Sequence, residues 1–266
     1  MQGIVRRAAA SWLCGWLAVA VPAAAEDLPV DLELVLAADV SLSMDLRELS
    51  LQRAGYVAAI QSPEVVAAIQ SGYQGRIAVT FVEWAGVHLP PRPLPWHVIG
   101  SADEAQAFAA AIQARPLQRA RRTSISGALM TASTLFDENG YAGFRQVIDV
   151  SGDGPNNQGA PVAKTRDAVV ARGITINGLA LMLDPLPADW YNIPDLDAYY
   201  DNCVVGGFAA FSLAIQSMTA FESALRRKLV TEIAGHAPPA RVIRAATGYD
   251  CLIGEKRWQA RMGSFD

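Results

Sequence analysis

The sequence predicts an α/β protein with a doubly wound, mostly parallel β-sheet, helices on both faces and one antiparallel edge strand. Apolar, β-branched runs alternate with segments whose apolar residues recur at helical spacing, as is typical of parallel sheets covered by helices. The 266 residues are 52% hydrophobic and 18% charged, which is enough apolar material for one sizeable core. Because no Gly- or Ser-rich linker and no internal repeat interrupts the pattern, we expect a single domain over residues 26–235.

The first four elements follow from short apolar runs and from periodicity. Leu32–Ala38 is almost entirely apolar and short, which predicts a buried strand. Leu46–Ile60 has apolar residues at helical spacing with arginine and glutamine between them, and Pro63–Ile69 adds a short helix. Arg76–Trp84 is rich in β-branched and aromatic residues, so it is predicted to be the second strand.

The middle of the chain continues the alternation. Pro93–Ile99 follows a proline-rich turn, which favours an edge strand. Ala102–Ala114 is rich in alanine and is predicted to be a helix capped by Ser101. Ser124–Asp137 is predicted to be a further helix, and Arg145–Val150 a further strand.

The last elements complete the sheet and its cover. Val162–Arg172 is predicted to be a helix and Ile174–Leu181 a strand, with Gly173 between them as a helix stop. Ala210–Ile215 is predicted to be the last strand, and Thr219–Ile233 the last long helix.

Two segments stand outside the alternating pattern. Residues 184–202 are an insertion between two strands, with three prolines and with Tyr191, Tyr199 and Tyr200. We expect this insertion to lie on the surface, either as an interface or as a loop that covers the sheet. The tail, residues 236–266, is expected to be irregular.

The first 25 residues have the three-part pattern of a secretory signal peptide. Two arginines give a positive start, an apolar stretch follows, and Ala23–Ala25 offers a cleavage site. We therefore expect a periplasmic or secreted protein that is soluble and has no membrane span after cleavage. An uncleaved anchor is the alternative, although the apolar stretch is short for a span.

Composition and missing motifs exclude several function classes. The net charge is -4 with histidine neutral, and no basic block is present, so a nucleic-acid partner has no electrostatic support. The sequence has no Walker loop, no G-x-G-x-x-G fingerprint and no G-x-S-x-G elbow. Its three histidines are scattered without the spacing of a zinc site.

Two cysteines remain once the leader, which contains Cys14, is removed. In an oxidising compartment Cys203 and Cys251 are expected to form a disulfide that ties the tail back to the domain. Two buried free thiols are the alternative.

Acids and hydroxyls gather where the predicted strands end. Asp39, Ser41 and Ser43 come directly after the first strand, Thr123 precedes a helix, and Asp153 follows a later strand. In an open α/β sheet the ligands bind at the carboxyl ends of the strands, near the point where strand order reverses. Hard oxygen ligands of this kind suit Mg²⁺ or Mn²⁺, so we predict a metal site. A purely structural polar cluster is the alternative.

This arrangement resembles the metal-ion-dependent adhesion site of von Willebrand factor A-type domains. That site reads D-x-S-x-S, then a threonine before a helix, then an aspartate-glycine pair after a strand. The resemblance covers roughly residues 30–235 and is closest to a family of exported bacterial proteins of this fold with no assigned function. Cys203–Gly207 and Tyr249–Cys251 carry the likeness to that subgroup. One departure is Ser-Gly-Asp-Gly in the third loop, where the broader family often has Thr-Asp-Gly.

The resemblance implies a binding module without enzymatic activity. Mg²⁺ or Mn²⁺ would be held by Ser41, Ser43 and Thr123, with Asp39 and Asp153 bound directly or through water. Because Mg²⁺ takes six oxygen ligands, at least one position is left to a partner. The implied function is adhesion or scaffolding, in which a carboxylate of a protein partner completes the coordination.

A haloacid-dehalogenase-like phosphatase is the alternative. Ser151–Asn157 resembles the G-D-G-x-x-D metal loop of that family, and Asp39 would be the nucleophile. Ser41, however, stands where that family has its second acid, and Asn157 where the loop has its last one. The required lysine precedes the loop in that family, whereas Lys164 follows it here. Acid–base catalysis would therefore lack its proton carrier.

Residues near the predicted site have two interpretations each. Arg119, Arg121 and Arg122 precede Thr123 and either clamp an acidic partner or form a solvated turn. Trp84 ends the second strand and either lines the rim of the site or packs in the core, the second being the default.

Overall fold

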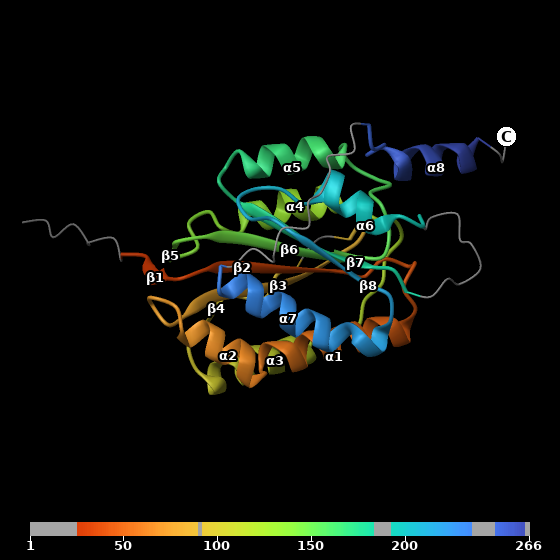
Figure 1. The fold of residues 1–266 in the computed structure, drawn as a ribbon. Helices are drawn as coiled ribbons and strands as arrows, with labels where there is room; N and C mark the ends of the chain where they lie inside the picture. The colour runs from red at the N-terminus through yellow and green to blue at the C-terminus, as the bar shows by residue number, and fades with distance from the viewer. Residues whose placement is uncertain (1–25, 90–91, 184–192, 236–247, 264–266) are drawn as a thin grey trace, which may run out of the picture.

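A six-stranded sheet carries the fold, with the strand order β4-β3-β2-β6-β7-β8 (Figure 1). The structure, a computed structural model, describes residues 26–89, 92–183, 193–235 and 248–263. All neighbouring strands of this sheet run parallel except β4, which pairs antiparallel with β3 at the edge. The strands are β2 (Glu33–Asp39), β3 (Ile77–Trp84), β4 (His97–Ile99), β6 (Gln146–Gly152), β7 (Thr175–Leu181) and β8 (Ser212–Ile215).

Helices cover both faces of the sheet, so the predicted fold class is confirmed (Figure 1). One face carries α1 (Leu46–Ile60), α2 (Pro63–Gln70), α3 (Ala102–Gln113) and α7 (Phe221–Ile233). The other carries α4 (Ile125–Thr134), α5 (Val162–Val170) and α6 (Leu196–Tyr199). Each helical layer buries its own apolar core against the sheet.

The central strand β2 explains why the sheet needs both layers. Leu34 and Leu36 belong to the core beneath α1 and α7, whereas Val35 and Ala37 belong to the core beneath α4. Successive side chains of a strand point to opposite faces, so an uninterrupted apolar run is stable only between two helical layers. The strand order reverses at β2, and its carboxyl end is Asp39.

Side-chain caps begin α1 and α3. At α1, Asp45 Oδ1 accepts from the amide of Glu48 at 2.7 Å, and Glu48 Oε2 accepts from the amide of Asp45 at 2.7 Å. This reciprocal capping box starts the helix directly after the D-x-S-x-S segment. At α3 the predicted cap is confirmed, because Ser101 Oγ accepts from the amide of Glu104 at 3.3 Å.

Three parts of the structure differ from the sequence prediction. A short parallel pair, β1 (Leu28–Val30) with β5 (Tyr141–Gly143), was not predicted. The tail was expected to be irregular, which is wrong for α8 (Ile253–Met262). The insertion was expected on the surface, yet Tyr199 and Tyr200 are fully buried. They belong to α6 and to a π-helical turn (η1, Tyr200–Val204), and they are buried because the segment covers the sheet beside β7.

A glycine in the sheet makes room for this insertion. A Cβ atom at Gly178, on β7, would lie 2.7 Å from Tyr200 Cδ1. Tyr191 and the neighbouring residues 184–192 lie outside the described part of the chain, as do residues 236–247 and residues 1–25, which the sequence predicts to be a signal peptide. None of the described helices combines the length and the hydropathy that a membrane span requires.

A disulfide joins the insertion to the tail. Cys203 lies in the π-helical turn and Cys251 lies just before α8, and their Cα atoms are 5.5 Å apart. The bond therefore attaches α8 to the helical layer that contains α6.

Buried charges join α7 to the sheet. Lys228 Nζ lies 2.6 Å from Asp149 Oδ1 of β6 and also pairs with Glu232 one turn further along α7. Asn177 Nδ2 of β7 donates to Glu232 Oε1 at 2.8 Å. Although burial acts to lower it, the charges of Asp149 and Glu232 raise the pKa of Lys228. Burial also raises the pKa of Glu232 to about 7.

Candidate metal centre

Four of the five predicted site residues form one chain of hydrogen bonds. The amide of Ser41 donates to Asp39 Oδ1 at 2.7 Å, so the loop turns back onto the end of β2. The hydroxyls of Ser41 and Ser43 lie 2.7 Å apart and share a hydrogen bond. Ser43 Oγ then donates to Asp153 Oδ1 at 2.7 Å, although the two residues are far apart in sequence. The end of β2 and the loop after β6 thus meet at the carboxyl edge of the sheet.

Thr123 lies beside this chain and is held there by its backbone. An isolated β-bridge joins Ser41 to Ala120, and the amide of Leu42 donates to the carbonyl of Ala120 at 2.9 Å. On the other side, the amide of Thr123 donates to Asn157 Oδ1 at 3.0 Å, and the amide of Asn157 donates to the carbonyl of Thr123 at 2.9 Å. In the described part of the chain, no hydrogen bond joins the Thr123 hydroxyl to the other four residues.

The two carboxyl groups of the centre are hard to ionise without a cation. Burial, with the charge of Asp153 second, raises the pKa of Asp39 well above its usual value. Loss of solvent raises the pKa of Asp153 to about 6. Asp39 Oδ2 is buried and has no hydrogen-bond partner among the described residues. Two buried carboxyl groups of this kind are stabilised when they bind a proton or a cation. Hard oxygen ligands are those that Mg²⁺ and Mn²⁺ take.

No other metal-binding cluster competes with this one in the residues that the structure describes. No group of three or more histidine, cysteine, aspartate or glutamate side chains is placed to hold an ion there. The candidate centre differs from such clusters because three of its five residues offer hydroxyls, which are neutral ligands and neutralise little of a cation's charge.

Beneath the centre lies a layer of buried polar atoms that the sequence did not reveal. A Cβ atom at Gly152 would lie 2.8 Å from Tyr200 Oη, 3.0 Å from Asp39 Oδ2 and 3.3 Å from Trp84 Cζ2. Burial, and then the charge of Asp39, raises the pKa of Tyr200 well above its usual value. Trp84 is buried in the core, as expected. The sequence could not identify Tyr200 as a neighbour of the site, because Tyr200 belongs to the proline-rich insertion and has no characteristic spacing from the motif.

Replacing Gly152 by alanine is expected to disturb this layer. The new methyl group would press on Tyr200 and Asp39, so we expect Gly152→Ala to destabilise the fold by about 1–3 kcal/mol. Urea unfolding followed by circular dichroism measures this loss. Gly263→Ala is the matched control, because its Cβ atom would meet no atom closer than 3.6 Å. Equal stability of the two variants would contradict the close packing of Tyr200 and Asp39 around Gly152.

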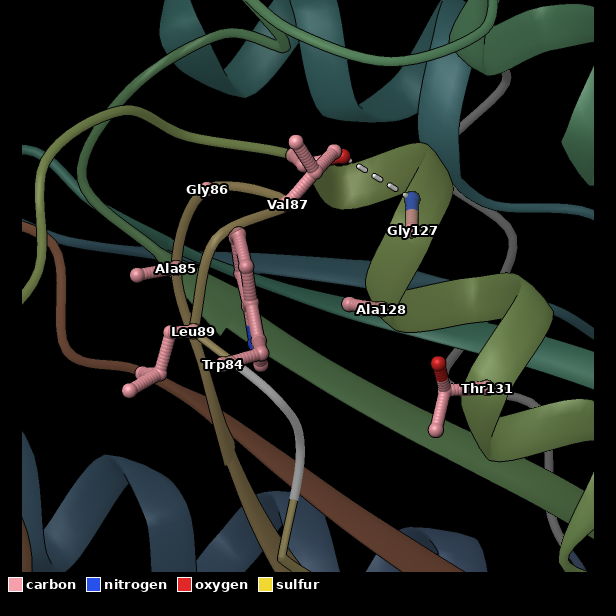
Figure 2. A pocket seen from close by; sticks show the side chains of 9 residues that line it. Trp84, Ala85, Gly86, Val87, Leu89, Gly127, Ala128 and Thr131 are labelled. Carbon is pink, nitrogen blue, oxygen red and sulfur yellow. Dashed lines mark hydrogen bonds between the residues drawn. The ribbon is translucent and has the colours of Figure 1, made fainter.

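A cleft is lined by Trp84 at the end of β3 and by Ser124, the residue after Thr123 (Figure 2). It encloses about 220 Å³ between the segment after β3 and the first turns of α4. Figure 2 shows the bond from the Gly127 amide to Ser124 Oγ, 3.2 Å long, at its edge. The lining carries no charged group, so the cleft is suited to an uncharged side chain. Its residues are Trp84, Ala85, Gly86, Val87, Leu89, Ser124, Gly127, Ala128 and Thr131.

Two of the three arginines before Thr123 make contacts inside the chain. Arg119 Nη2 donates to the carbonyl of Leu42 at 2.9 Å. The guanidinium carbon of Arg122 lies 3.0 Å from the ring centroid of Trp258, which is on α8. Both side chains are partly exposed to solvent, and one contacts the loop after β2 while the other contacts α8.

Comparison with known proteins gives one family match. The model of a family described as "Protein of unknown function (DUF1194)" matches residues 29–237. No curated protein matches the chain.

Solved structures share the fold at low sequence identity. The pilus adhesin SpaC from Lactobacillus rhamnosus GG superposes with a TM-score of 0.56 and 14% identity, covering 79% of this chain and 31% of that one. Proximal thread matrix protein 1 from the mussel byssus gives 0.55 and 14%, covering 79% and 49%. A second structure of the mussel protein, with a zinc-occupied MIDAS motif, gives 0.52 and 13%, covering 79% and 50%. These likenesses show a von Willebrand A-type fold, and the chain spans about a third to a half of the length of these proteins.

Proposed function

This chain belongs to the DUF1194 family, and we propose that it binds another protein through a divalent cation. Asp39, Ser41, Ser43, Thr123 and Asp153 would hold Mg²⁺ or Mn²⁺, with the two aspartates bound directly or through water. When bound, the cation supplies an electrophilic centre that accepts an oxygen from outside the chain. The mussel protein whose MIDAS motif holds zinc supports a divalent cation at this place in the fold.

One observation carries this proposal above all others. Asp39 Oδ2 is a buried carboxylate oxygen without a hydrogen-bond partner among the described residues, at the end of a chain of hydroxyls. Leaving such an atom unpaired destabilises a fold, so buried carboxylates are usually paired or bound to metal. A cation held by these oxygens would balance both aspartates at once.

The partner we propose is a protein that presents an aspartate or glutamate. A carboxylate is the hard, negatively charged ligand that completes an oxygen-coordinated cation. The role is adhesion or scaffolding rather than catalysis, which the fold of the pilus adhesin supports. Nothing in the site favours the phosphatase alternative, since Ser41 bonds to the centre where that family has its proton carrier.

We propose further that the chain is exported before it binds. On this proposal residues 1–25 are a signal peptide, residues 26–235 form the von Willebrand A-like domain, and residues 236–266 form a tail tied back to it. The mature protein would then work in the periplasm or outside the cell.

Affinity capture tests the proposed function. The immobilised mature chain is expected to retain an envelope protein in Mg²⁺ and to release it in EDTA, because the cation bridges the two proteins. Amidation of carboxylates on the released protein should prevent rebinding. Asp153→Asn bait should capture nothing, whereas Asp103→Asn bait, altered at an exposed acid on α3, should capture normally. Equal capture with and without EDTA would overturn the proposal.

A further inference from the structure

The C-terminal helix α8 lies against the loop that follows Asp153. A Cβ atom at Gly254, in its first turn, would overlap the carbonyl oxygen of Asn156 and would lie 3.1 Å from Pro155 Cβ. Only glycine allows this approach without a shift. The helix thus contacts the backbone of the loop that carries one of the candidate ligands.

A side chain of α8 joins this loop to the start of α4. Glu255 Oε1 accepts from Asn156 Nδ2 at 2.7 Å. Asn156 Oδ1 accepts in turn from the amide of Ser126 at 3.0 Å. The next residue, Asn157, exchanges two hydrogen bonds with Thr123. Glu255 therefore lies at the outer end of a set of contacts that places the Asp153 loop against Thr123.

A second contact of α8 reaches the residue before Thr123. Arg122 has a φ of 77°, in the left-handed region that a residue with a Cβ atom rarely adopts. Its guanidinium lies over the ring of Trp258, 3.0 Å from the centroid, where cation and ring attract. The stacking holds Arg122 in this conformation, and the conformation determines how Thr123 enters the centre.

The disulfide holds α8 in place over both loops. Cys251 lies two residues before α8 and is bonded to Cys203 of the π-helical turn. Tyr249 adds a hydrogen bond to Asp195 Oδ2 at 2.9 Å and an edge contact with the ring of Tyr199. Cys203 is buried, whereas Cys251 is partly exposed. A small dithiol can therefore reach the bond.

We propose that α8 is a clamp for the candidate centre, with Glu255 and Trp258 as positioning residues and the Cys203–Cys251 disulfide as its lock. The affinity of the centre for a cation then depends on the redox state of the disulfide. The lock opens by thiol–disulfide exchange, in which a dithiol gives up two electrons and two protons and becomes a cyclic disulfide. Cys203 and Cys251 become thiols. The expected change in metal affinity rests on the proposed function, whereas the positioning of the two loops by α8 does not.

The test compares the oxidised mature chain with the same chain reduced by dithiothreitol. Calorimetric titration with Mg²⁺ is expected to show an affinity about 10-fold or more weaker after reduction, as when partners behind metal ligands are lost. Hydrogen–deuterium exchange should become faster at the amides of Thr123, Ser126 and Asn157. Exchange in β2 and β3 should stay unchanged, which separates opening of the clamp from unfolding.

Variants at Glu255 and Trp258 test whether loss of these two contacts causes the weaker Mg²⁺ binding. Trp258→Ala and Glu255→Ala, which keep the disulfide, should weaken Mg²⁺ binding in the oxidised chain. Trp258→Phe and Glu255→Gln should restore it, because the ring and the acceptor oxygen return. The double variant Cys203→Ser with Cys251→Ser should behave as the reduced chain and ignore dithiothreitol.

Two results would overturn the clamp or separate it from the proposed function. Unchanged Mg²⁺ affinity together with unchanged exchange at Thr123 after reduction overturns the clamp. If the oxidised chain binds no Mg²⁺, the proposed function fails. Exchange at Thr123 then tests the clamp by itself: faster exchange after reduction supports it, and unchanged exchange overturns it.

Discussion

Asp39→Asn is expected to abolish Mg²⁺ binding and, in the same protein, to stabilise the metal-free fold. Asp39 is fully buried, and burial with the charge of Asp153 raises its pKa. A carboxyl whose pKa is higher in the folded state than in the unfolded state stabilises the fold fully at a pH below its unfolded-state pKa. This stabilisation is lost as the pH rises through its folded-state pKa. At neutral pH the buried Asp39 carboxyl therefore costs folding free energy in the absence of a cation, and asparagine removes that cost together with the ligand.

Two measurements on one preparation check this opposite response. Calorimetry should show an Mg²⁺ affinity lower by about 100-fold or more, since loss of residues behind a ligand already weakens binding about 10–100-fold. Thermal unfolding in EDTA should show a higher melting temperature for Asp39→Asn than for the native chain, and added Mg²⁺ should raise the melting temperature of the native chain and leave that of Asp39→Asn unchanged. Asp103→Asn, at an exposed acid on α3, is the control and should respond as the native chain. Equal heats for Asp39→Asn and the native chain would rule out the metal site.

Lys228→Met is expected to be the most destabilising single change outside the candidate centre, by about 3–5 kcal/mol. Methionine fills a similar volume but leaves Asp149 and Glu232, whose side chains are 0% exposed, without the ammonium group that pairs with both. The cost arises from two buried carboxylates that lose their counter-charge rather than from lost packing. Because α7 packs against α1 and α2, weakening this anchor loosens a whole helical layer.

Urea unfolding at neutral pH measures the effect of Lys228→Met. Lys164→Met is the matched control, because Lys164 is exposed on α5, and it should change stability by less than about 0.5 kcal/mol. A triple variant, Lys228→Met with Asp149→Asn and Glu232→Gln, should recover part of the loss because no charge remains buried. If the triple variant is as unstable as Lys228→Met, packing rather than charge explains the loss.

Much of the fold could be predicted because its signals are local. Leu32–Ala38 could be read as a buried strand from seven consecutive residues, and the helix Leu46–Ile60 from the spacing of its own apolar side chains. The strand pair β1 and β5 was missed because each partner has three residues, too few for a period to be visible.

The layer around the candidate centre could not be predicted, because its contacts join distant segments of unremarkable composition. Tyr200 lies near Asp39 only because Gly178 leaves room for its ring. Lys228 resembles any charged residue late in a helix, and its burial depends on Asp149 lying opposite it in the sheet. The helix α8 could not be predicted because its residues form no strong apolar face, and its contacts include a hydrogen bond from Asn156 to Glu255 and the stacking of Arg122 on Trp258.

The sequence alone therefore determined the α/β class and placed Asp39, Ser41 and Ser43 at the end of the first predicted strand. Periodicity and strand-end position are properties of consecutive residues, so they survive without coordinates. Only the tertiary structure decided that Asp153 bonds to Ser43, that Tyr200 lies beneath Asp39 and that α8 covers the loops beside Thr123. Those facts depend on which distant side chains the packed layers bring together, and no local pattern encodes that choice.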